Sequence, residues 1–340
     1  MTALRDPALD DRLHALKAWI AARLRSNDFR LERASADASF RRYFRVFLDG
    51  GRTLIAMDAP PARENSAAFV SVAGLLRSAG LNAPEIHEHD LGEGFLLVTD
   101  LGTEPYLAAL REETADRLFG DATSALVRWQ AASRAGVLPD YDEQLLRREL
   151  ELFPEWYVGR HLGVKLGPAQ RLALEGVFGA ILGRNLAEPR VYVHRDYMPR
   201  NLMVTDPNPG VLDFQDAVYG PVSYDVACLF RDAFVSWDEE RVLDGTIRYW
   251  EKARRAGLPV REDFADFWRD VEWMAVQRHL KVLGIFARLH YRDGKSGYLD
   301  DTPRFIGYVR RAVARYDELA PLGRLLDELE GARAEVRSTF

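Results

Sequence analysis

The spacing of apolar residues divides the chain into a short β-rich segment and a longer helical one. Asp11–Arg25 repeats apolar side chains at helical spacing, which predicts an N-terminal helix. Asn65–Ala79 has the same spacing, and Gly80 is a typical residue just past a helix end. Short runs rich in β-branched and aromatic residues, bounded by turn signals, predict strands around this second helix. These runs are Phe29–Ala34, Tyr43–Leu48, Thr53–Met57 and Phe95–Thr99.

From Tyr106 onward the apolar spacing is mainly helical. The predicted helices cover residues 106–135, 143–162, 168–188, 221–232, 238–256, 261–291 and 303–331. Val191–Val193, Leu202–Thr205 and Val211–Phe214 interrupt this pattern as short apolar strands joined by tight loops. Strands within a helical segment suggest that the loops beside them serve chemistry rather than packing.

Composition and charge narrow the class of protein. A chain of 340 residues is long enough for two lobes or domains. The formal net charge of -6 argues against general nucleic-acid binding, and no apolar run reaches the ~20 residues that span a bilayer. The polar segment Met1–Asp11 does not resemble a secretory signal. We therefore expect a cytoplasmic protein with no nucleic-acid or membrane partner, and the sequence does not indicate whether it has a protein partner.

The most informative pattern lies in the loops beside the short strands. His194-Arg195-Asp196-Tyr197-Met198-Pro199-Arg200-Asn201 has the form H-R-D-x-x-x-x-N, and Leu212-Asp213-Phe214 follows at a strand end. Both are parts of the catalytic signature of protein kinases. Two ordinary loop acids and a turn-forming asparagine are the alternative, but the joint spacing argues against it. The P-loop and G-x-S-x-G motifs of other enzyme classes are absent from the sequence.

Phosphoryl transfer to a hydroxyl explains why these residue types occur together. A carboxylate beside the hydroxyl can align it and accept its proton, which is the role predicted for Asp196. Mg²⁺ prefers oxygen ligands, and Asn201 and Asp213 would supply an amide oxygen and a carboxylate. His194 and Asp225 are predicted to be structural, the first as a hydrogen-bonding residue and the second as a brace for the catalytic loop.

The β-rich segment would hold the nucleotide. The loop that runs from residue 36 to Tyr43 lies between two predicted strands, where a phosphate-covering loop belongs, although it lacks G-x-G-x-x-G. Backbone N–H groups and arginines can bind phosphate there, and a solvated basic hairpin is the alternative. Phe95–Leu101 would be the strand and hinge that meet the adenine. The residues predicted to bind nucleotide are Ser39, Phe40, Arg41, Arg42, Asp100 and Leu101.

The chain resembles the aminoglycoside phosphotransferase superfamily of kinase-like enzymes, and within it the bacterial anomeric kinases of N-acetylmuramate and N-acetylglucosamine in peptidoglycan recycling. The matching stretches are Asp37–Val46, Met57–Pro61, Gly94–Gly102, Glu149–Tyr157, His194–Met203, Val211–Leu229 and Gln277–Arg288. The resemblance implies an α+β, bilobal, protein-kinase-like fold. Residues 1–101 would form a small antiparallel sheet lobe with one inserted helix, and 102–340 a mostly helical lobe. It also implies ATP, Mg²⁺ and phosphorylation of the sugar's C1 hydroxyl, giving a product for a nucleotidyltransferase.

One position departs from the kinase pattern. The third strand of a kinase usually carries a lysine that pairs with the α- and β-phosphates, and Met57 occupies that place. A thioether cannot neutralise phosphate charge, so either Arg41 or Arg42 substitutes, or Mg²⁺ and backbone donors suffice. Glu64 then has no obvious lysine partner. A nucleotide-binding pseudokinase and a kinase of an aminoglycoside, choline or another amino alcohol remain alternatives.

The sugar site is expected in the helical segment. Aromatic faces stack on sugar rings, and a guanidinium can bind a lactyl carboxylate. A solvated or salt-bridged surface is the alternative for each of these side chains. The residues predicted to bind the sugar are Arg147, Glu149, Trp156, Arg231 and Lys281.

Overall fold

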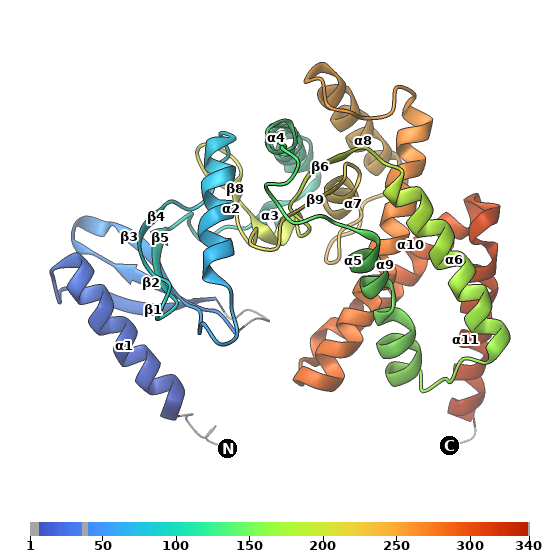
Figure 1. The fold of residues 1–340 in the computed structure, drawn as a ribbon, viewed down its shortest axis with the longest axis horizontal. Helices are drawn as coiled ribbons and strands as arrows, with labels where there is room; N and C mark the ends of the chain where they lie inside the picture. Colours follow the sequence, from blue (N-terminus) through green and yellow to red (C-terminus); the bar gives the residue numbers. More distant parts are fainter. Residues whose placement is uncertain (1–6, 36–39, 339–340) are drawn as a thin grey trace. The chain divides into compact units, whose positions relative to one another are not determined.

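The computed structural model describes residues 7–35 and 40–338, and the chain divides into two units (Figure 1). One unit comprises Met1–Glu104 with Met203–Asp216, and the other comprises Pro105–Leu202 with Ala217–Phe340. The sequence predicts a single division of the chain, after residue 101. The structure instead returns a hairpin from the second half of the chain to the first unit, because that hairpin makes its contacts there.

The first unit is built on an antiparallel five-stranded sheet with strand order β1-β2-β3-β5-β4 (Figure 1). The strands are β1 (Arg30–Ser35), β2 (Arg42–Phe47), β3 (Thr53–Asp58), β4 (Ile86–Asp90) and β5 (Phe95–Thr99). The edge strand β4 is missing from the sequence prediction. Its residues are Ile-His-Glu-His-Asp, and their mainly polar, exposed side chains give no apolar alternation.

Helices α1 (Pro7–Leu24) and α2 (Ser66–Ser78) complete the first unit. In α1, Leu16 and Ile20 are fully buried in a cluster with strand residues that include Phe44 and Val46. At the start of α2, the Asn65 side chain accepts a hydrogen bond from the Ala68 N–H group, which is a helix N-cap. The sequence predicted both helices, because apolar residues recur in each at helical spacing.

The second unit is mainly helical (Figure 1). Its helices are α3 (Tyr106–Ala109), α4 (Glu112–Ala131), α5 (Glu143–Leu150), α6 (Pro168–Leu186), α7 (Tyr224–Phe230), α8 (Glu239–Arg255), α9 (Phe264–Asp293), α10 (Thr302–Arg315) and α11 (Ala320–Ser338). A π-helical segment, η2 (Phe153–His161), follows α5, and a 3₁₀ turn, η3 (Pro199–Asn201), precedes the hairpin. Strand β6 (Arg190–Val193) pairs with β9 (Val218–Pro221), and β7 (Leu202–Met203) with β8 (Gly210–Val211).

Helix α9 packs at the centre of the second unit, against η2, α5, α6, α7, α8 and α10. It is buried along most of its 30 residues, including polar residues in its middle. At Gly284 the neighbouring backbone comes so close that a Cβ atom would lie 2.3 Å from the Leu152 carbonyl oxygen. Glycine at this position is therefore required by close packing rather than by an unusual backbone angle.

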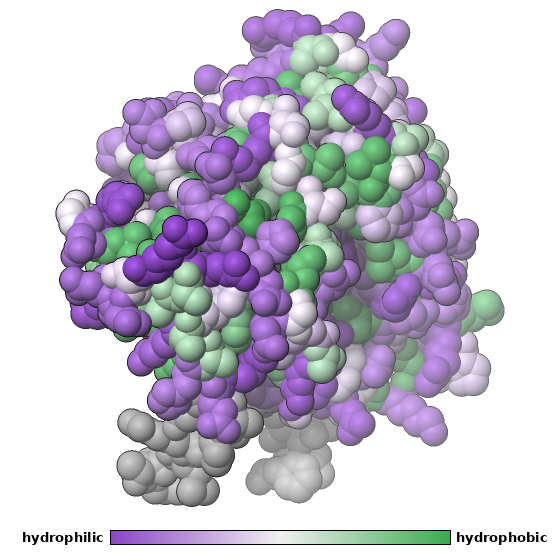
Figure 2. Space-filling model, turned by 60° about the vertical axis from the view of Figure 1, so that its left-hand side comes forward, coloured by the Kyte–Doolittle hydropathy of each residue, from purple (hydrophilic) through white to green (hydrophobic). Residues whose placement is uncertain are grey.

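The visible face in Figure 2 is mostly hydrophilic, with apolar side chains scattered over it. Large exposed apolar residues such as Leu172 occur singly, which is ordinary for a protein surface. Among the described residues, none of the helices combines the length and the apolar character that crossing a membrane would require.

The predicted α+β class is confirmed, with a small antiparallel sheet, one inserted helix and a mostly helical remainder. Several predicted helix bounds are wrong. The helix predicted over 143–162 ends at Leu150 and continues as η2, where Pro154 cannot donate a backbone hydrogen bond. The helix predicted over 303–331 is two helices, α10 and α11, which apolar spacing alone did not separate.

Candidate active site

The loop after β6 carries the H-R-D motif in the second unit. His194 is buried, and its Nδ1 atom accepts a hydrogen bond from the Asp196 N–H group at 3.3 Å. The Tyr197 hydroxyl donates to the Ala122 carbonyl at 2.8 Å, which ties the loop to α4. Arg195 has a φ of 76°, a left-handed conformation that costs a non-glycine residue about 1–2 kcal/mol. Contacts around the loop must therefore hold this conformation.

Asp225, on α7, provides one of these contacts. It is fully buried and accepts hydrogen bonds from the backbone N–H groups of His194, at 2.6 Å, and Arg195, at 3.0 Å. Burial raises the pKa of Asp225 to about 7, although the two backbone donors act to lower it. The structure thus places Asp225 where a brace for the catalytic loop is predicted.

Glu149, on α5, holds the side chain of Arg195 in a network of buried polar groups. Its carboxylate lies 2.5 Å from the Arg195 guanidinium and 2.8 Å from Lys281 Nζ. It also accepts hydrogen bonds from the Tyr141 hydroxyl and, at 3.1 Å, from Gln277 Nε2. Burial would raise the pKa of Glu149, but the charges of Lys281 and Arg195 outweigh this and lower it to about 2. Glu149 is therefore ionised and bound by four donors.

Most of the residues predicted to bind the sugar have partners inside the protein. Glu149 and Lys281 bind each other, and Arg231 lies 2.7 Å from Glu239. Arg147 lies at the surface, 2.8 Å from Glu175. These are the salt bridges that the sequence left open as an alternative. Trp156, on η2, is partly exposed, and its part in sugar binding stays a prediction, as does that of the other four.

Asn201 belongs to the same loop as Asp196. Its amide Nδ2 donates to the Asp196 carbonyl at 2.9 Å, and its backbone N–H donates to the Met198 carbonyl at 2.8 Å. The first bond orients the amide group, so that its oxygen rather than its nitrogen would be a metal ligand. The second unit thus brings Asp196 and Asn201 together in one hydrogen-bonded turn.

Asp213 belongs to the first unit and follows β8. It has a φ of 61°, and its Oδ1 atom accepts a hydrogen bond from Gln215 Nε2 at 2.9 Å. The next residue, Phe214, is fully buried against Phe69 of α2, with ring centroids 4.7 Å apart. Packing of Phe214 on α2 therefore fixes the backbone that carries Asp213.

The segment before β2 carries the predicted phosphate contacts, of which Ser39 lies outside the described residues. The Arg41 guanidinium is 2.8 Å from the Glu64 carboxylate, and the Phe40 N–H group donates to the same carboxylate at 3.1 Å. Both charged side chains are about nine-tenths buried. Met57 is fully buried in β3. An arginine from the preceding segment therefore gives Glu64 the cationic partner that the sequence analysis did not find.

Two other residues predicted to bind nucleotide are in ion pairs within the first unit. Arg42 Nε lies 2.8 Å from the fully buried Asp58 carboxylate, which Arg12 of α1 also contacts. The Asp100 carboxylate lies 2.5 Å from Arg45 and accepts from the Gly102 N–H group at 3.0 Å. Burial would raise the pKa of Asp100, but these hydrogen bonds outweigh burial and lower it. The Asp100 carboxylate is therefore bound within the first unit, and nucleotide binding by Asp100 and Leu101 stays a prediction.

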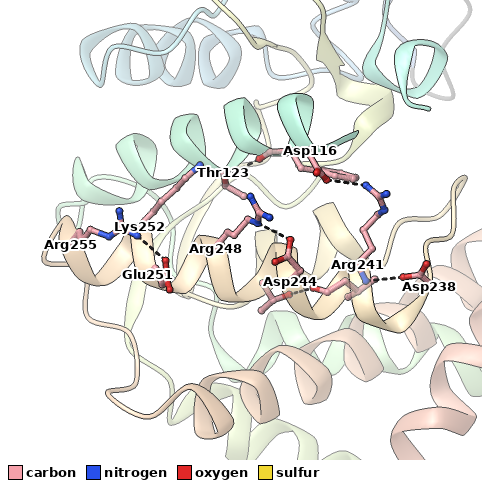
Figure 3. A network of polar contacts seen from close by, with 12 residues as sticks. Asp116, Thr123, Asp238, Arg241, Asp244, Arg248, Glu251, Lys252 and Arg255 are labelled. Atoms are coloured by element: carbon pink, nitrogen blue, oxygen red, sulfur yellow. Dashed lines mark hydrogen bonds and ion pairs between the residues drawn. The ribbon is translucent and has the colours of Figure 1, made fainter. Parts of the chain in front are cut away.

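A hollow of about 260 Å³ between α4 and α8 contains none of these residues (Figure 3). Its charged side chains are paired with one another, as with Arg241 and Asp116 at 3.0 Å and Arg248 and Asp244 at 2.7 Å. Lys252 Nζ donates to the Thr123 hydroxyl of α4 at 2.8 Å (Figure 3) and to the Gly120 carbonyl at 2.7 Å. The contacts of Arg241 and Lys252 join α8 to α4, whereas the pair of Arg248 and Asp244 lies within α8. The hollow is therefore lined by contacts that stabilise the packing of these helices.

Sequence reasoning missed Arg278, which lies on α9 next to Gln277. Its side chain is 2% exposed, and its Nη2 atom contacts the sulfur atom of Met198 in the catalytic loop at 3.7 Å. The signal was present in the sequence, because an arginine at the centre of a long, mostly apolar helix is unusual.

The fold and the braced H-R-D loop define a phosphotransferase of the kinase-like class. A choline/ethanolamine kinase family protein from Mesorhizobium loti has the same fold, with a TM-score of 0.63, 16% identity, and coverage of 95% of this chain and 99% of that one. The model of the phosphotransferase enzyme family matches residues 30–264, and the chain belongs to this family.

Two curated relatives are much more similar in sequence. The N-acetylmuramate/N-acetylglucosamine kinase of Pseudomonas aeruginosa is 56% identical over 302 residues, which cover 88% of this chain and 89% of the relative. The protein of the same name from Pseudomonas putida is 52% identical over 341 residues, covering 96% and 100%. The resemblance stated from the sequence is therefore confirmed, and the chain is a kinase.

Proposed function

We propose that the protein transfers the γ-phosphoryl group of ATP to the anomeric C1 hydroxyl of N-acetylmuramate or N-acetylglucosamine. The carrying observation is identity above 50%, over nearly the full length, to two kinases named for these sugars. The braced catalytic loop supports the same reaction, since Asp225 holds the backbone of His194 and Arg195 and Glu149 holds the Arg195 side chain, directly before Asp196.

In this proposal Asp196 is the base. Its carboxylate accepts a hydrogen bond from the sugar hydroxyl, aligns the oxygen with the γ-phosphorus and takes the proton as the new P–O bond forms. The proton must leave because the product is a phosphate ester. The bond between Asp196 and Asn201 keeps the base and the neighbouring amide in a fixed relation, so the loop needs little reorganisation during the reaction.

Asn201 and Asp213 would hold Mg²⁺. Their amide and carboxylate oxygens fit the hard oxygen ligands that this ion prefers. When bound, Mg²⁺ neutralises the charge that the phosphate oxygens carry. The left-handed backbone at Asp213, with Phe214 buried beside it, supports a position that is fixed for a ligand.

Arg41 would take the place of the usual strand lysine. In kinases that lysine pairs with a glutamate of the inserted helix and contacts the α- and β-phosphates. The pair of Arg41 and Glu64 supplies the same two charges from a different position. This pair weakens the argument for a pseudokinase, which rested on Met57. The sugar 1-phosphate would be consumed by an enzyme that transfers a nucleotidyl group to it.

Substitution of Asp196 tests the proposal. Purified protein is incubated with Mg·ATP and each of N-acetylmuramate, N-acetylglucosamine, choline and an aminoglycoside, with ADP release as the readout. We expect turnover with the amino sugars, a phosphate on C1 by ³¹P NMR, and a loss of about 10²–10⁴-fold in Asp196→Asn.

Asp244→Asn, at an exposed position of α8 where the carboxylate pairs with Arg248, is the control and should keep wild-type turnover. Turnover with choline alone would replace the proposal with an amino-alcohol kinase. Binding of ATP without ADP release on any acceptor would indicate a pseudokinase. Full activity in folded Asp196→Asn would remove Asp196 as the base.

A further inference from the structure

Arg278 is a buried cation that has no carboxylate partner among the described residues. Within the part of the chain that the structure describes, its one hydrogen bond is from Nη2 to the Met198 sulfur at 3.7 Å, and a thioether is a weak acceptor. Its Nη1 atom is buried and has no hydrogen-bond partner. Burying a charge in this way costs several kcal/mol unless the charge is paired.

Neighbouring buried cations of the second unit are satisfied differently. Arg195 and Lys281 share the Glu149 carboxylate, and Arg231 is paired with Glu239. Arg278 lies on the same helix as Lys281, yet no carboxylate of the described residues comes within ion-pair distance of it. Of these four buried cations, Arg278 is therefore the one that lacks a carboxylate partner among the described residues.

Arg278 lies next to the catalytic loop that carries Asp196. Met198 is two residues from Asp196, and the groups that interact with the Arg278 charge include Cys228, Tyr224, Asp232 and Asp196. Burial would lower the pKa of Arg278, but these groups outweigh it and raise the pKa, so the guanidinium stays charged. Asp232 accepts from the backbone of Phe234 and Val235, and burial raises its pKa, which makes it a poor counterion.

We propose that Arg278 is a substrate-binding residue, whose guanidinium binds an anionic oxygen next to Asp196 when the acceptor is in place. The inference rests on the proposed function. The anion is either the carboxylate of the acceptor sugar or the phosphoryl group being transferred, and a planar guanidinium suits both. Binding of this anion supplies the partner that the protein itself does not.

Arg278→Met tests this, with Arg269→Met as the matched control. Arg269 is on the same helix but lies at the surface, paired with Glu318. Comparing the two sugars shows which anion Arg278 binds, because N-acetylmuramate has a carboxylate and N-acetylglucosamine has none. If the carboxylate is bound, KM for N-acetylmuramate rises about 10- to 100-fold and N-acetylglucosamine is unaffected. If the phosphoryl group is bound, kcat falls by a similar factor with both sugars.

Two further measurements separate binding from a structural role. Methionine has a similar length and no charge to bury, so the melting temperature of ligand-free Arg278→Met should equal or exceed that of the wild type. Calorimetry of N-acetylmuramate binding without nucleotide should show weaker binding only if the carboxylate is the ligand. Arg278→Lys should recover part of the lost activity.

Unchanged kcat and KM with both sugars would overturn the inference. A lower melting temperature that accompanies the loss of activity would also overturn it, because Arg278 would then be a structural counter-charge. Failure of the proposed function gives a different result, since the wild type itself would release no ADP with either sugar.

Discussion

Two buried carboxylates hold the catalytic loop, and their surroundings shift their pKa values in opposite directions. Among the described residues, the hydrogen-bond donors to Asp225 are backbone N–H groups, and burial raises its pKa to about 7. Glu149 faces Arg195 and Lys281, whose charges outweigh burial and lower its pKa to about 2. Both residues have a carboxyl group, but Glu149 stays ionised at neutral pH, whereas Asp225 can be protonated near pH 7.

Replacing Glu149 tests whether its ionised carboxylate stabilises the folded protein. Glu149→Gln leaves Arg195 and Lys281 buried without a counter-charge, so we expect a loss of about 3–5 kcal/mol in the free energy of unfolding at pH 7. The stabilisation by Glu149 is fully present above its unfolded pKa, about 4.5, because the folded pKa is the lower one. It is lost as the pH falls from 4.5 towards 2.

Urea unfolding of the wild type and of Glu149→Gln between pH 7 and pH 3 provides the measurement. The difference between the two proteins should be constant above about pH 5.5 and should shrink below pH 4.5. Glu175→Gln, which affects an exposed ion pair, is the control and should change stability by less than about 1 kcal/mol. A difference that does not vary with pH would contradict the assignment of Glu149 as the buried anion.

At the scale of elements, the sequence predicted those that have strong apolar patterns. Helix α2 has an apolar face, an N-cap at Asn65 and a glycine after its end, and its predicted span is close to the observed one. Strand β4 was missed because its side chains are mainly polar and its place in the sheet depends on pairing with β5. Partner strands and packing decide such elements, and local sequence does not contain that information.

Close packing between α9 and the segment after α5 gives a prediction at this scale. In Gly284→Ala the new methyl group would meet the Leu152 backbone, which cannot move like a side-chain tip, so we expect a loss of about 1–3 kcal/mol. Gly307→Ala on α10 is the control, since the added methyl meets no atom within 4 Å. Alanine there should stabilise the protein by about 0.5–1 kcal/mol through helix propensity. Equal effects of the two substitutions on thermal unfolding would contradict the packing argument.

At the scale of the whole molecule, the motif residues belong to different units. Asp196 and Asn201 lie in the second unit, whereas Asp213 and the pair of Arg41 and Glu64 lie in the first. Under the proposed function, Mg·ATP binds the folded protein and not the unfolded chain. Its binding should therefore stabilise the folded protein as a whole.

Thermal unfolding with and without Mg·ATP measures this stabilisation. At a hundred times its Kd, Mg·ATP should raise the free energy of unfolding of the wild type by about 2.7 kcal/mol, seen as a higher Tm. Asp213→Asn should lose most of this gain, because a metal ligand is removed, while Asp196→Asn should retain it. EDTA should abolish the gain in the wild type. Equal gains in both variants would remove Asp213 from the metal site.

By itself, the sequence determined the α+β class, most of the helices, and the motif that carries Asp196, Asn201 and Asp213. These features depend on local periodicity and on residue spacing within one loop and one hairpin, which a linear sequence records. The tertiary structure decided the partners of the charged groups. Arg41 meets Glu64, Glu149 meets Arg195 and Lys281, and Arg278 meets no carboxylate among the described residues. Such pairings join segments far apart in the chain, so only the packed fold determines them.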